Sequence, residues 1–339
     1  MNGPSAVLPE EALHLSNGDA TDVPGTGLAR RVVYWRDVLH EGPVPEVAPA
    51  ELRRVRADHL TACHGAEREA TLRAFAERDQ ALEDNRDGAY VLWFEADLYD
   101  QLHIVEILAR LAALGVPAER VTLICIGEYP GIAQFGGLGQ LTAEQLRELP
   151  GTGACARLTP AALELATRAW AAFRAPTPEG LAAIAAARLG ELRFLGEAFD
   201  RLGREYPSTR DGLSLSERRV LAAVAAGAPD AGTAFVRAGA REPRPFMGDL
   251  TCFDRMERLA RGPHPLLDLD PAAGPVTRAT RLRLTDTGAR VLAGQADQVT
   301  LNGVDRWIGG VHLHGHQVAW RWNEATETVT PAAKEQESQ

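Results

Sequence analysis

The chain has 339 residues, enough for two compact domains or for one large domain with an appendage. Hydrophobic residues make up 45% of it and charged residues 24%, as in an ordinary globular protein. The formal net charge of −10 argues against indiscriminate attraction to nucleic acid or to an anionic membrane. We find neither a signal-peptide pattern nor an apolar run of spanning length, so we expect a cytoplasmic protein without a membrane partner.

The charges are unevenly distributed along the chain. Residues 201–300 carry fifteen Arg against twelve Asp and Glu, a net charge of +3, so the remainder carries −13. This asymmetry leaves a nucleic-acid partner open for the later region. The four cysteines lie far apart and form no CxxC pair, which predicts free thiols rather than zinc or redox chemistry.

The first half alternates strand-like and helix-like segments. A loop too short for a regular crossover helix joins the first two apolar runs, so their pairing is open. Residues 48–83 predict one or two amphipathic helices, and a helix at 98–114 between two apolar runs predicts a βαβ unit. The expected strands are LHLS at 13–16, VVYW at 32–35, YVLWF at 90–94 and VTLICIG at 121–127.

The later segments are mainly helical. Thr142 and Gln145 form a capping-box pattern, and the alanine-rich stretch 181–203 predicts a connector helix. From residue 213, three helices precede two strand-like segments, PLLDLD and TRLRLT, which is the order of a winged helix. The expected helices of this part are 215–226, 230–239 and 249–261.

These patterns predict an α/β protein with a Rossmann-like, mostly parallel sheet in its N-terminal half, followed by a helical connector and a winged-helix-like C-terminal domain. We expect the last domain to end in a β-hairpin around Gly315 and the polar tail to be disordered. The expected bounds are 10–150 for the α/β domain, 151–212 for the connector, 213–325 for the winged-helix-like domain and 326–339 for the tail.

A winged-helix order serves either DNA binding or packing and dimerisation. The third helix, 249–261, would be the reader of DNA, yet its acids balance its arginines, whereas a recognition helix normally carries uncompensated donors. We therefore favour packing over DNA as its role and leave a homo-oligomer open. The charged side chains of this helix are Asp249, Asp254, Glu257, Arg255, Arg258 and Arg261.

Acidic residues follow three of the expected strands, at Asp19, Asp37 and Asp97. Open α/β sheets bind their ligands beyond the carboxyl ends of their strands. Carboxylates crowded there repel one another unless a metal ion, a cationic substrate or shared protons compensate them. The pattern predicts a polar site for a small molecule, although Asn17-Gly18-Asp19 is equally typical of a simple turn.

The segment WRDVLHEGPVP, residues 35–45, places an imidazole between two carboxylates before a Gly-Pro bend. His40 has a pKa suited to proton transfer near neutrality, and Asp37 or Glu41 would orient its ring. The structural alternative is a hydrogen-bonded loop in which His40 satisfies backbone groups.

Capping competes with chemistry in EADLYDQ, residues 95–101. Asp97 and Asp100 suit the first turn of the following helix, so Glu95, at the strand end, is the preferred functional acid. The glycine-rich FGGLGQL, residues 135–141, lacks the Lys and hydroxyl residue of a P-loop and favours a flexible lid.

Three histidines, His312, His314 and His316, would share one side of a strand, which is a metal-ligand spacing. Gly315 at the expected turn breaks this alternation, so we do not favour a three-histidine site.

Taken together, these segments resemble a bacterial family classified as a domain of unknown function. The resemblance runs from about 13 to 322 and rests on NGD, WRDVLHEGP, ExDLxDQ, GLGQL, PSTRDGLSLSERRVL, FMGD, LTDTGARVLAG and DRWIGGVHL. It implies no reaction. The segment after Asp19 looks shorter than the usual helix of the family, and His314 and His316 fall outside its pattern. The positions that match its signature are Asp19, Trp35, Asp37, His40, Glu41, Glu95, Asp97, Asp100, Gln101, Gly137, Gly139 and Gln140.

The first functional hypothesis is a hydrolase or transferase for a small polar substrate, with nucleotides as one candidate class and a divalent metal as a candidate cofactor. The alternative is a ligand-sensing transcriptional regulator that binds DNA through the winged-helix-like domain. A weaker hypothesis is a partner-binding protein anchored by Trp307, Trp320 and Trp322. The residues of the first hypothesis are His40, Asp37, Glu41 and Glu95 for catalysis, Asp19 and Glu95 for the metal, and Asn17, Asp19, Trp35, Arg36, Asp97, Asp100, Gln101, Gly137, Gly139 and Gln140 for the substrate.

Overall fold

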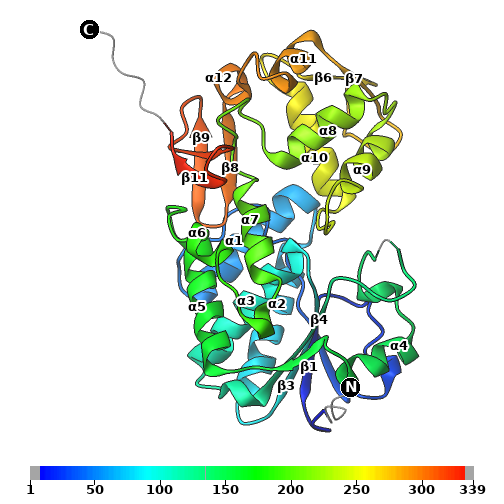
Figure 1. The fold of residues 1–339 in the computed structure, drawn as a ribbon, viewed down its shortest axis with the longest axis vertical. Helices are drawn as coiled ribbons and strands as arrows, with labels where there is room; N and C mark the ends of the chain where they lie inside the picture. Colours follow the sequence, from blue (N-terminus) through cyan, green and yellow to red (C-terminus); the bar gives the residue numbers. More distant parts are fainter. Residues whose placement is uncertain (1–7, 134, 333–339) are drawn as a thin grey trace.

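The computed structural model describes residues 8–133 and 135–332, and it is an α/β protein with a mostly parallel five-stranded sheet (Figure 1). The strand order is β2-β1-β3-β4-β5, in which β5 pairs antiparallel with β4 and the other neighbours are parallel. The strands are β1 (Leu13–Ser16), β2 (Arg31–Tyr34), β3 (Tyr90–Glu95), β4 (Val121–Ile126) and β5 (Cys155–Arg157).

Four of these strands lie within one residue of the ranges expected from the apolar runs. The pairing that the sequence left open is parallel, with Leu13 opposite Arg31. Side chains alternate between two cores, since Leu92 and Phe94 of β3 join one and Val91 and Trp93 join the other. The sequence missed β5, because its three residues form no apolar run.

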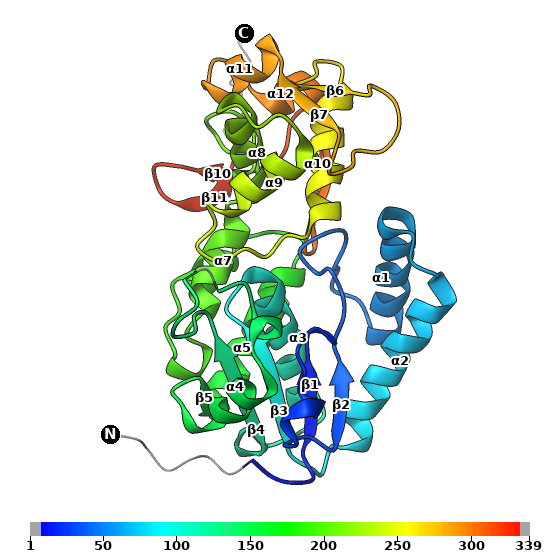
Figure 2. The same ribbon diagram turned by 90° about the vertical axis from the view of Figure 1, so that its right-hand side faces the viewer.

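Helices cover the sheet and extend toward the second part of the chain (Figures 1 and 2). The capping box of Thr142 and Gln145 is confirmed. The single connector helix expected over 181–203 is wrong, because Leu189 is extended and a 3-10 turn at Gly190–Leu192 separates two helices. The helices of this part are α1 (Pro49–His64), α2 (Arg68–Asp84), α3 (Leu98–Ala113), α4 (Ala143–Glu148), α5 (Pro160–Arg174), α6 (Leu181–Ala185) and α7 (Leu195–Gly203).

A second unit, which we call the helical body, has its own hydrophobic core. It lies above the sheet, on the side toward which the arrow of β2 points (Figure 2). The carboxyl ends of the parallel strands therefore face this body. It consists of α8 (Leu215–Ala225), α9 (Ala231–Gly239), α10 (Asp249–Arg261), β6 (Leu267–Asp270), β7 (Arg281–Leu284) and α11 (Asp286–Leu292).

The C-terminal segment forms two hairpins rather than one. The expected turn at Gly315 is wrong, because the chain reverses at Gly309-Gly310, where a Cβ on Gly309 would lie 2.0 Å from the carbonyl oxygen of Phe173. Part of the predicted tail forms β11, and residues 333–339 lie outside the described residues. The elements are α12 (Gln298–Asn302), β8 (Val304–Ile308), β9 (Val311–Gly315), β10 (Trp320–Asn323) and β11 (Thr328–Pro331).

These hairpins pack with the α/β part, since Val311, Leu313 and Trp322 belong to its core and not to the core of the helical body. The range 213–325, expected as one domain, thus contributes to two cores. Among the described residues, no helix is both long enough and apolar enough to cross a membrane. All four cysteines are free thiols, as the spacing predicted.

Candidate functional site

Three carboxylates meet where β3 ends and α3 begins. Glu95, Asp97 and Asp100 each place one oxygen within 4.8 Å of the oxygens of the other two. Asp100 is buried, and Glu95 and Asp97 are half-buried. We call this group the acid cluster. Two of its members were expected mainly as helix caps, so its compactness was not evident from the sequence.

Hydrogen bonds from the two neighbouring strand ends hold the cluster in place. The Asn17 amide, just beyond β1, donates to both carboxylate oxygens of Asp100 at 3.0 and 2.9 Å. The backbone N–H of Glu95 donates to Asp100 at 2.6 Å. Asp97 caps α3 by accepting from the backbone N–H of Asp100 at 3.0 Å. Capping and clustering are therefore compatible roles for Asp97.

The acid cluster lacks compensating cations. Among residues 8–133 and 135–332, no arginine or histidine forms an ion pair with any of its three carboxylates. Burial is the main cause that raises the pKa of each carboxyl group, and the neighbouring carboxylates add to it for Asp97 and Asp100. The pKa of Asp97 rises to about 7, and that of Asp100 lies well above its ordinary value. The cluster thus retains protons near neutrality unless a cation joins it.

The glycine-rich loop reaches the cluster through its backbone. The N–H of Leu138 donates to Glu95 Oε1 at 2.6 Å. Gly137 has φ 141°, and a Cβ there would lie 2.5 Å from Glu95 Oε2, so only glycine lets the chain pass so closely. Gly139 packs similarly near Ala20. The loop expected as a lid is tied to Glu95, and Gln140 accepts from the loop's own backbone at Gly136.

Asp19 and Arg36 lie outside the acid cluster. Their side chains form an exposed ion pair at 3.2 Å across the ends of β1 and β2. The group of three carboxylates within 4.8 Å of one another contains Glu95 and does not include Asp19, which was expected beside Glu95 at a metal.

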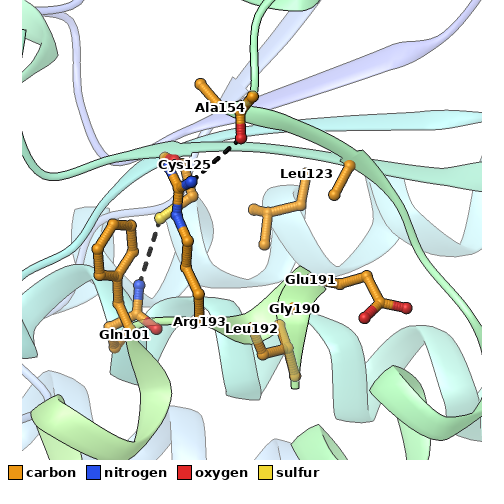
Figure 3. A pocket seen from close by; sticks show the side chains of 11 residues that line it. Gln101, Leu123, Cys125, Ala154, Gly190, Glu191, Leu192 and Arg193 are labelled. Carbon is orange, nitrogen blue, oxygen red and sulfur yellow. Dashed lines mark hydrogen bonds between the residues drawn. The ribbon is translucent and has the colours of Figure 1, made fainter. Parts of the chain in front are cut away.

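Gln101 faces away from solvent. Its amide donates to the carbonyl oxygen of Glu95 at 2.8 Å. The same amide contacts the sulfur of Cys125 at 3.5 Å (Figure 3). The adjoining cavity, also lined by Arg193, has a volume of about 20 Å³, room for about one water molecule. Gln101 therefore supports the strand end beneath the cluster and has no space beside it for a substrate.

Trp35 and Asp37 are buried in structural contacts. The indole N–H of Trp35 donates to Glu106 at 2.8 Å. Asp37 forms an ion pair with Arg56 at 2.7 Å, in which both side chains are at most 2% exposed. Arg56 also donates to the carbonyl oxygens of Val38, Glu41 and Pro43, so it fixes the loop that follows β2.

His40 is buried between two aromatic rings. It packs edge-on against Tyr99 and Phe246, with ring centroids 5.9 and 5.1 Å away. Neither ring nitrogen has a hydrogen-bond partner among the described residues. Burial lowers the pKa of His40 to about 4, although the nearby Glu41 charge opposes this. Neither Asp37 nor Glu41 hydrogen-bonds to its ring, since each carboxylate binds an arginine instead.

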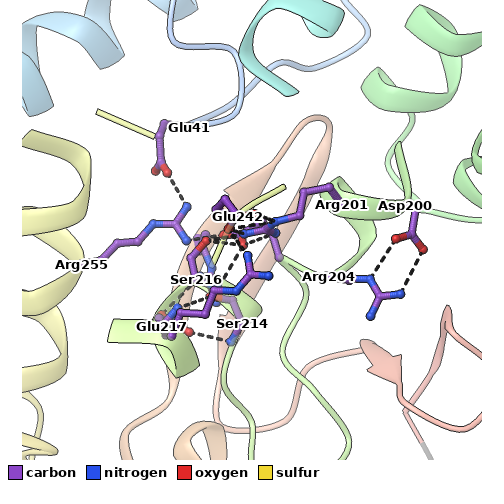
Figure 4. Close-up of polar contacts among 12 residues, drawn as sticks. Glu41, Asp200, Arg201, Arg204, Ser214, Ser216, Glu217, Glu242 and Arg255 are labelled. Carbon is purple, nitrogen blue, oxygen red and sulfur yellow. Dashed lines mark hydrogen bonds and ion pairs between the residues drawn. The ribbon is translucent and has the colours of Figure 1, made fainter. Parts of the chain in front are cut away.

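Glu41 begins a set of ion pairs that joins the α/β part to the helical body (Figure 4). It pairs with Arg255 of α10, and Arg255 also pairs with Glu205. The chain continues through Arg201, which bonds to Glu205 at 2.8 Å and to Glu242 at 2.7 Å. We call this group, completed by Arg219 on Glu242, the interdomain network. Its members are Glu41, Arg255, Glu205, Arg201, Glu242 and Arg219.

A cavity of about 270 Å³ adjoins the acid cluster at Asp97. Its other wall belongs to α7, α8 and the loop between α9 and α10. Two of its arginines, Arg204 and Arg244, form partly exposed ion pairs with Asp200 and Glu197 at 2.9 and 3.1 Å. The arginines that line the cavity are Arg201, Arg204, Arg219 and Arg244.

Sequence inspection missed the arginines that complete these sites. These arginines are separated in the sequence from the acids with which they pair, and no local motif identifies them. They are Arg56, Arg244 and Arg255. The one available signal was the balance of acids and arginines in the third helix of the helical body, where Arg255 is buried and charged.

The three histidines do not form a metal site. His312 stacks on Trp307 at a centroid distance of 4.4 Å and bonds to Asp305 at 2.7 Å. His316 lies beyond the end of β9. Of the three expected anchor indoles, Trp322 is buried and Trp307 and Trp320 are half-buried.

Comparison with protein-family models gave no match for this chain, and comparison with curated proteins gave none either. The family resemblance therefore stays an expectation.

Proposed function

We propose that the protein is a metal-assisted hydrolase or transferase that acts on a small polar substrate at the carboxyl edge of the sheet. The acid cluster is the observation that carries this proposal. Three oxygen donors converge within 4.8 Å in a partly buried position, and no arginine of the described part of the chain forms an ion pair with them. Oxygen-only donor sets of this kind suit Mg²⁺, Mn²⁺ or Ca²⁺.

The surroundings of the cluster favour ligation over simple capping. Asn17 and two backbone N–H groups orient Asp97 and Asp100, as groups behind metal ligands commonly do. Burial and the neighbouring Glu95 charge raise the pKa of Asp97 to about 7, and a cation bound there would favour the ionised carboxylates. It would supply Lewis-acid activation of water or of a substrate oxygen.

The adjoining cavity favours an anionic group on the substrate. Arginine beside a carboxylate-held cation is the recurrent arrangement for phosphoryl groups. Arg204 and Arg244 hold their present carboxylate partners in partly exposed pairs, which are weak and exchangeable. We therefore propose a nucleotide-like compound, one of the candidate classes, as the substrate. His40 has no part in this proposal as a base, because it is buried away from the cavity lining.

Cation binding to purified protein tests the proposal directly. Titration calorimetry with Mn²⁺ and Mg²⁺ should detect one site, weakened at least tenfold in Asp97→Asn and in Asp100→Asn. The matched control is Asp19→Asn, which changes an exposed carboxylate near the same strand ends and should bind normally. Absence of heat, together with no rise in melting temperature with any divalent cation, would remove the metal and the proposal with it.

A second candidate is the DNA-binding regulator. Its support is the sheet of the helical body, where β6 pairs antiparallel with β7 and Asp230 bridges to Arg281, the pairing expected of a winged helix. Against it, Arg255 of α10 is engaged with Glu41 and Glu205. A mobility-shift titration with promoter DNA at two salt concentrations distinguishes the candidates, since a regulator should lose affinity steeply with salt.

A further inference from the structure

A thiol and two imidazoles gather at the carboxyl-terminal end of α1. His59 and Cys63 lie four residues apart, so they occupy one face of the helix on successive turns. The sulfur of Cys63 lies 3.6 Å from Nδ1 of His59. In the described part of the chain, Cys63 is the one thiol within hydrogen-bonding distance of a histidine. We call His59, Cys63 and His64 the helix-end group.

The separation of sulfur and nitrogen matches two ligands of one metal ion. Zinc lies about 2.3 Å from a thiolate sulfur and about 2.1 Å from an imidazole nitrogen, and a tetrahedral angle between these bonds places the two ligand atoms about 3.6 Å apart. This is the distance between Cys63 and His59. A four-residue spacing on one helix face is also that of paired zinc-binding histidines. A weak thiol–imidazole hydrogen bond has a similar length, so the surroundings must distinguish the two.

The loop after β2 holds the His59 ring in place. Gly42 has φ 71°, and a Cβ on it would overlap the imidazole, so a glycine lets the loop pack directly on the ring. Burial, with the nearby charge of Arg56, lowers the pKa of His59 to about 4. The imidazole is therefore neutral at physiological pH, which is the form that binds a metal ion.

His64 offers a further nitrogen beside this pair. Its ring lies across that of His59, with centroids 6.1 Å apart and an angle of 83° between the planes. Within residues 8–133 and 135–332, its buried Nε2 has no hydrogen-bond partner. The three ligand atoms do not all lie within 4.8 Å of one another, so the His64 side chain must turn to join the pair. A metal ion would give this buried nitrogen the partner that it lacks.

Cys63 is a better metal ligand than nucleophile. Burial raises the pKa of its thiol, and the carboxylate of Asp254 adds to this effect while Arg258 opposes it. The thiol therefore keeps its proton at neutral pH, whereas a reactive cysteine is a thiolate. A metal ion that binds the sulfur displaces this proton to solvent.

We propose that the helix-end group binds a transition-metal ion of the Zn²⁺ class, with His59 and Cys63 as the first two ligands, His64 as the third and water as the fourth. One sulfur with two nitrogens is a donor set for Zn²⁺ or Co²⁺, whereas the oxygen donors of the acid cluster suit Mg²⁺, Mn²⁺ or Ca²⁺. The two sites therefore select different ions. No CxxC pair marks this site, because its ligands are one cysteine and two histidines of a single helix end.

Titration of the full-length, reduced protein with Co²⁺ tests the site. Co²⁺ substitutes for Zn²⁺, and a cobalt–thiolate bond gives a charge-transfer band in the near ultraviolet. Oxygen donors give no such band, so Co²⁺ at the acid cluster would not contribute to it. We expect Co²⁺ to develop the band and Zn²⁺ to abolish it, because Zn²⁺ binds such sites more tightly. An excess of Mg²⁺ should leave the band unchanged.

Variants assign the band to its ligands. Cys63→Ser should abolish it, and His59→Gln and His64→Gln should weaken Co²⁺ binding about tenfold or more. One matched control is Cys155→Ser, which changes a half-buried thiol that contacts no histidine among the described residues. The other is Asp100→Asn, which changes the acid cluster. Both controls should keep the band and the affinity of wild type.

Cys63→Ser keeps the test decisive if His59→Gln disturbs the packing on Gly42, because Cys63 is exposed and serine is similar in size. Absence of the band in wild type would overturn the proposal. A band that survives in Cys63→Ser, or an unchanged affinity in a folded His59→Gln variant, would also overturn it, since the ligands would then lie elsewhere. Loss of the band in Cys155→Ser would have the same meaning.

Discussion

The acid cluster and the interdomain network are both groups of partly or fully buried charges, and they differ in one respect. Every carboxylate of the network meets a guanidinium, whereas no carboxylate of the cluster forms an ion pair with a described basic residue. The pKa values follow this difference. Arginine neighbours hold the pKa of Glu205 and Glu41 below their ordinary values against the effect of burial, while burial raises the pKa of Asp97 and Asp100.

This contrast distinguishes charged groups that stabilise the structure from charged groups that could bind a ligand. A paired network fixes one part of the protein against the other and has no charge left to offer a ligand. An unpaired cluster costs stability unless protons or a cation neutralise it, and such a cost is typical of functional sites. The two groups should therefore respond to mutation in opposite directions.

Arg255→Ala should have the largest effect. It would leave Glu41 and Glu205 buried without their shared cation, and breaking a buried pair in this way costs about 3–5 kcal/mol of unfolding free energy. Urea denaturation measures the loss. Arg283→Ala, which removes an arginine that is 81% exposed, is the control and should change stability by about 0.5 kcal/mol or less. A similar small change in both variants would show that the network does not stabilise the fold.

Gly137→Ala should have the next largest effect. The new Cβ would lie 2.5 Å from the Glu95 carboxylate, and φ 141° is unfavourable for alanine. Strain of this kind costs about 1–3 kcal/mol. Cation affinity should fall as well, because Glu95 must move. Gly153→Ala provides the comparison, since a Cβ there meets no atom within 4 Å and its φ is not positive. Normal stability and metal binding in Gly137→Ala would remove the proposed link between the loop and Glu95.

Asp97→Asn should stabilise the protein in a pH-dependent manner. The folded pKa of Asp97, about 7, lies above its unfolded value, so the folded state binds more protons between these values. The stabilising contribution of protonated Asp97 is therefore nearly complete at pH 4, close to the unfolded pKa of 3.8, and is lost as the pH rises through 7. The variant should gain about 1–2 kcal/mol over wild type at pH 8 and little at pH 4, after allowance for partial exposure.

Urea denaturation at the two pH values measures this difference. Mg²⁺ should remove it by stabilising wild type at pH 8, because the ion binds the ionised carboxylates of the folded protein. A variant that is less stable than wild type at both pH values would indicate that capping of α3 outweighs repulsion at Asp97.

Much of the α/β part could be predicted from the sequence, and most of the site could not. Apolar runs and capping residues identified β1 to β4 and the helices α8, α9 and α10, because these signals are local. The turn at Gly309-Gly310 was misplaced because the backbone of Phe173, far along the chain, selects it. Glu95 was singled out correctly as a strand-end acid. Its partners Asp97 and Asp100 had a sufficient local explanation as caps, so only three-dimensional proximity reveals the cluster.

The WRDVLHEGP segment is the opposite case, because its local sequence suggested a catalytic site and gave no sign of the ion pairs that its acids form. A His between two acids predicted a catalytic pair, but Arg56 and Arg255 bind those acids from other helices. In the structure the segment attaches the loop after β2 to α1 and to the helical body. Local composition cannot distinguish a charged active site from a set of ion pairs that joins two parts of the fold. The difference depends on whether arginines from distant parts of the chain bind the acids.

His40→Leu should have the smallest effect and completes the comparison. Neither ring nitrogen has a partner within residues 8–133 and 135–332, and replacing an unpartnered buried polar group by an apolar one of similar size is nearly neutral, within about 1 kcal/mol at pH 8. The folded pKa of about 4 lies below the unfolded value of 6.5, so the unfolded state binds more protons as the pH falls between them. Below pH 6.5, His40 therefore lowers the unfolding free energy of wild type. The leucine variant has no such pH-dependent loss.

Urea denaturation at pH 8 and pH 5 measures this gain, which should appear only at the lower pH. Cation binding at the acid cluster should be unchanged, because His40 contacts Tyr99 and Phe246 and no carboxylate of the cluster. Loss of turnover with normal stability and normal cation binding would instead return His40 to the catalytic role that the sequence suggested, and would require the helical body to move so that Phe246 uncovers its ring.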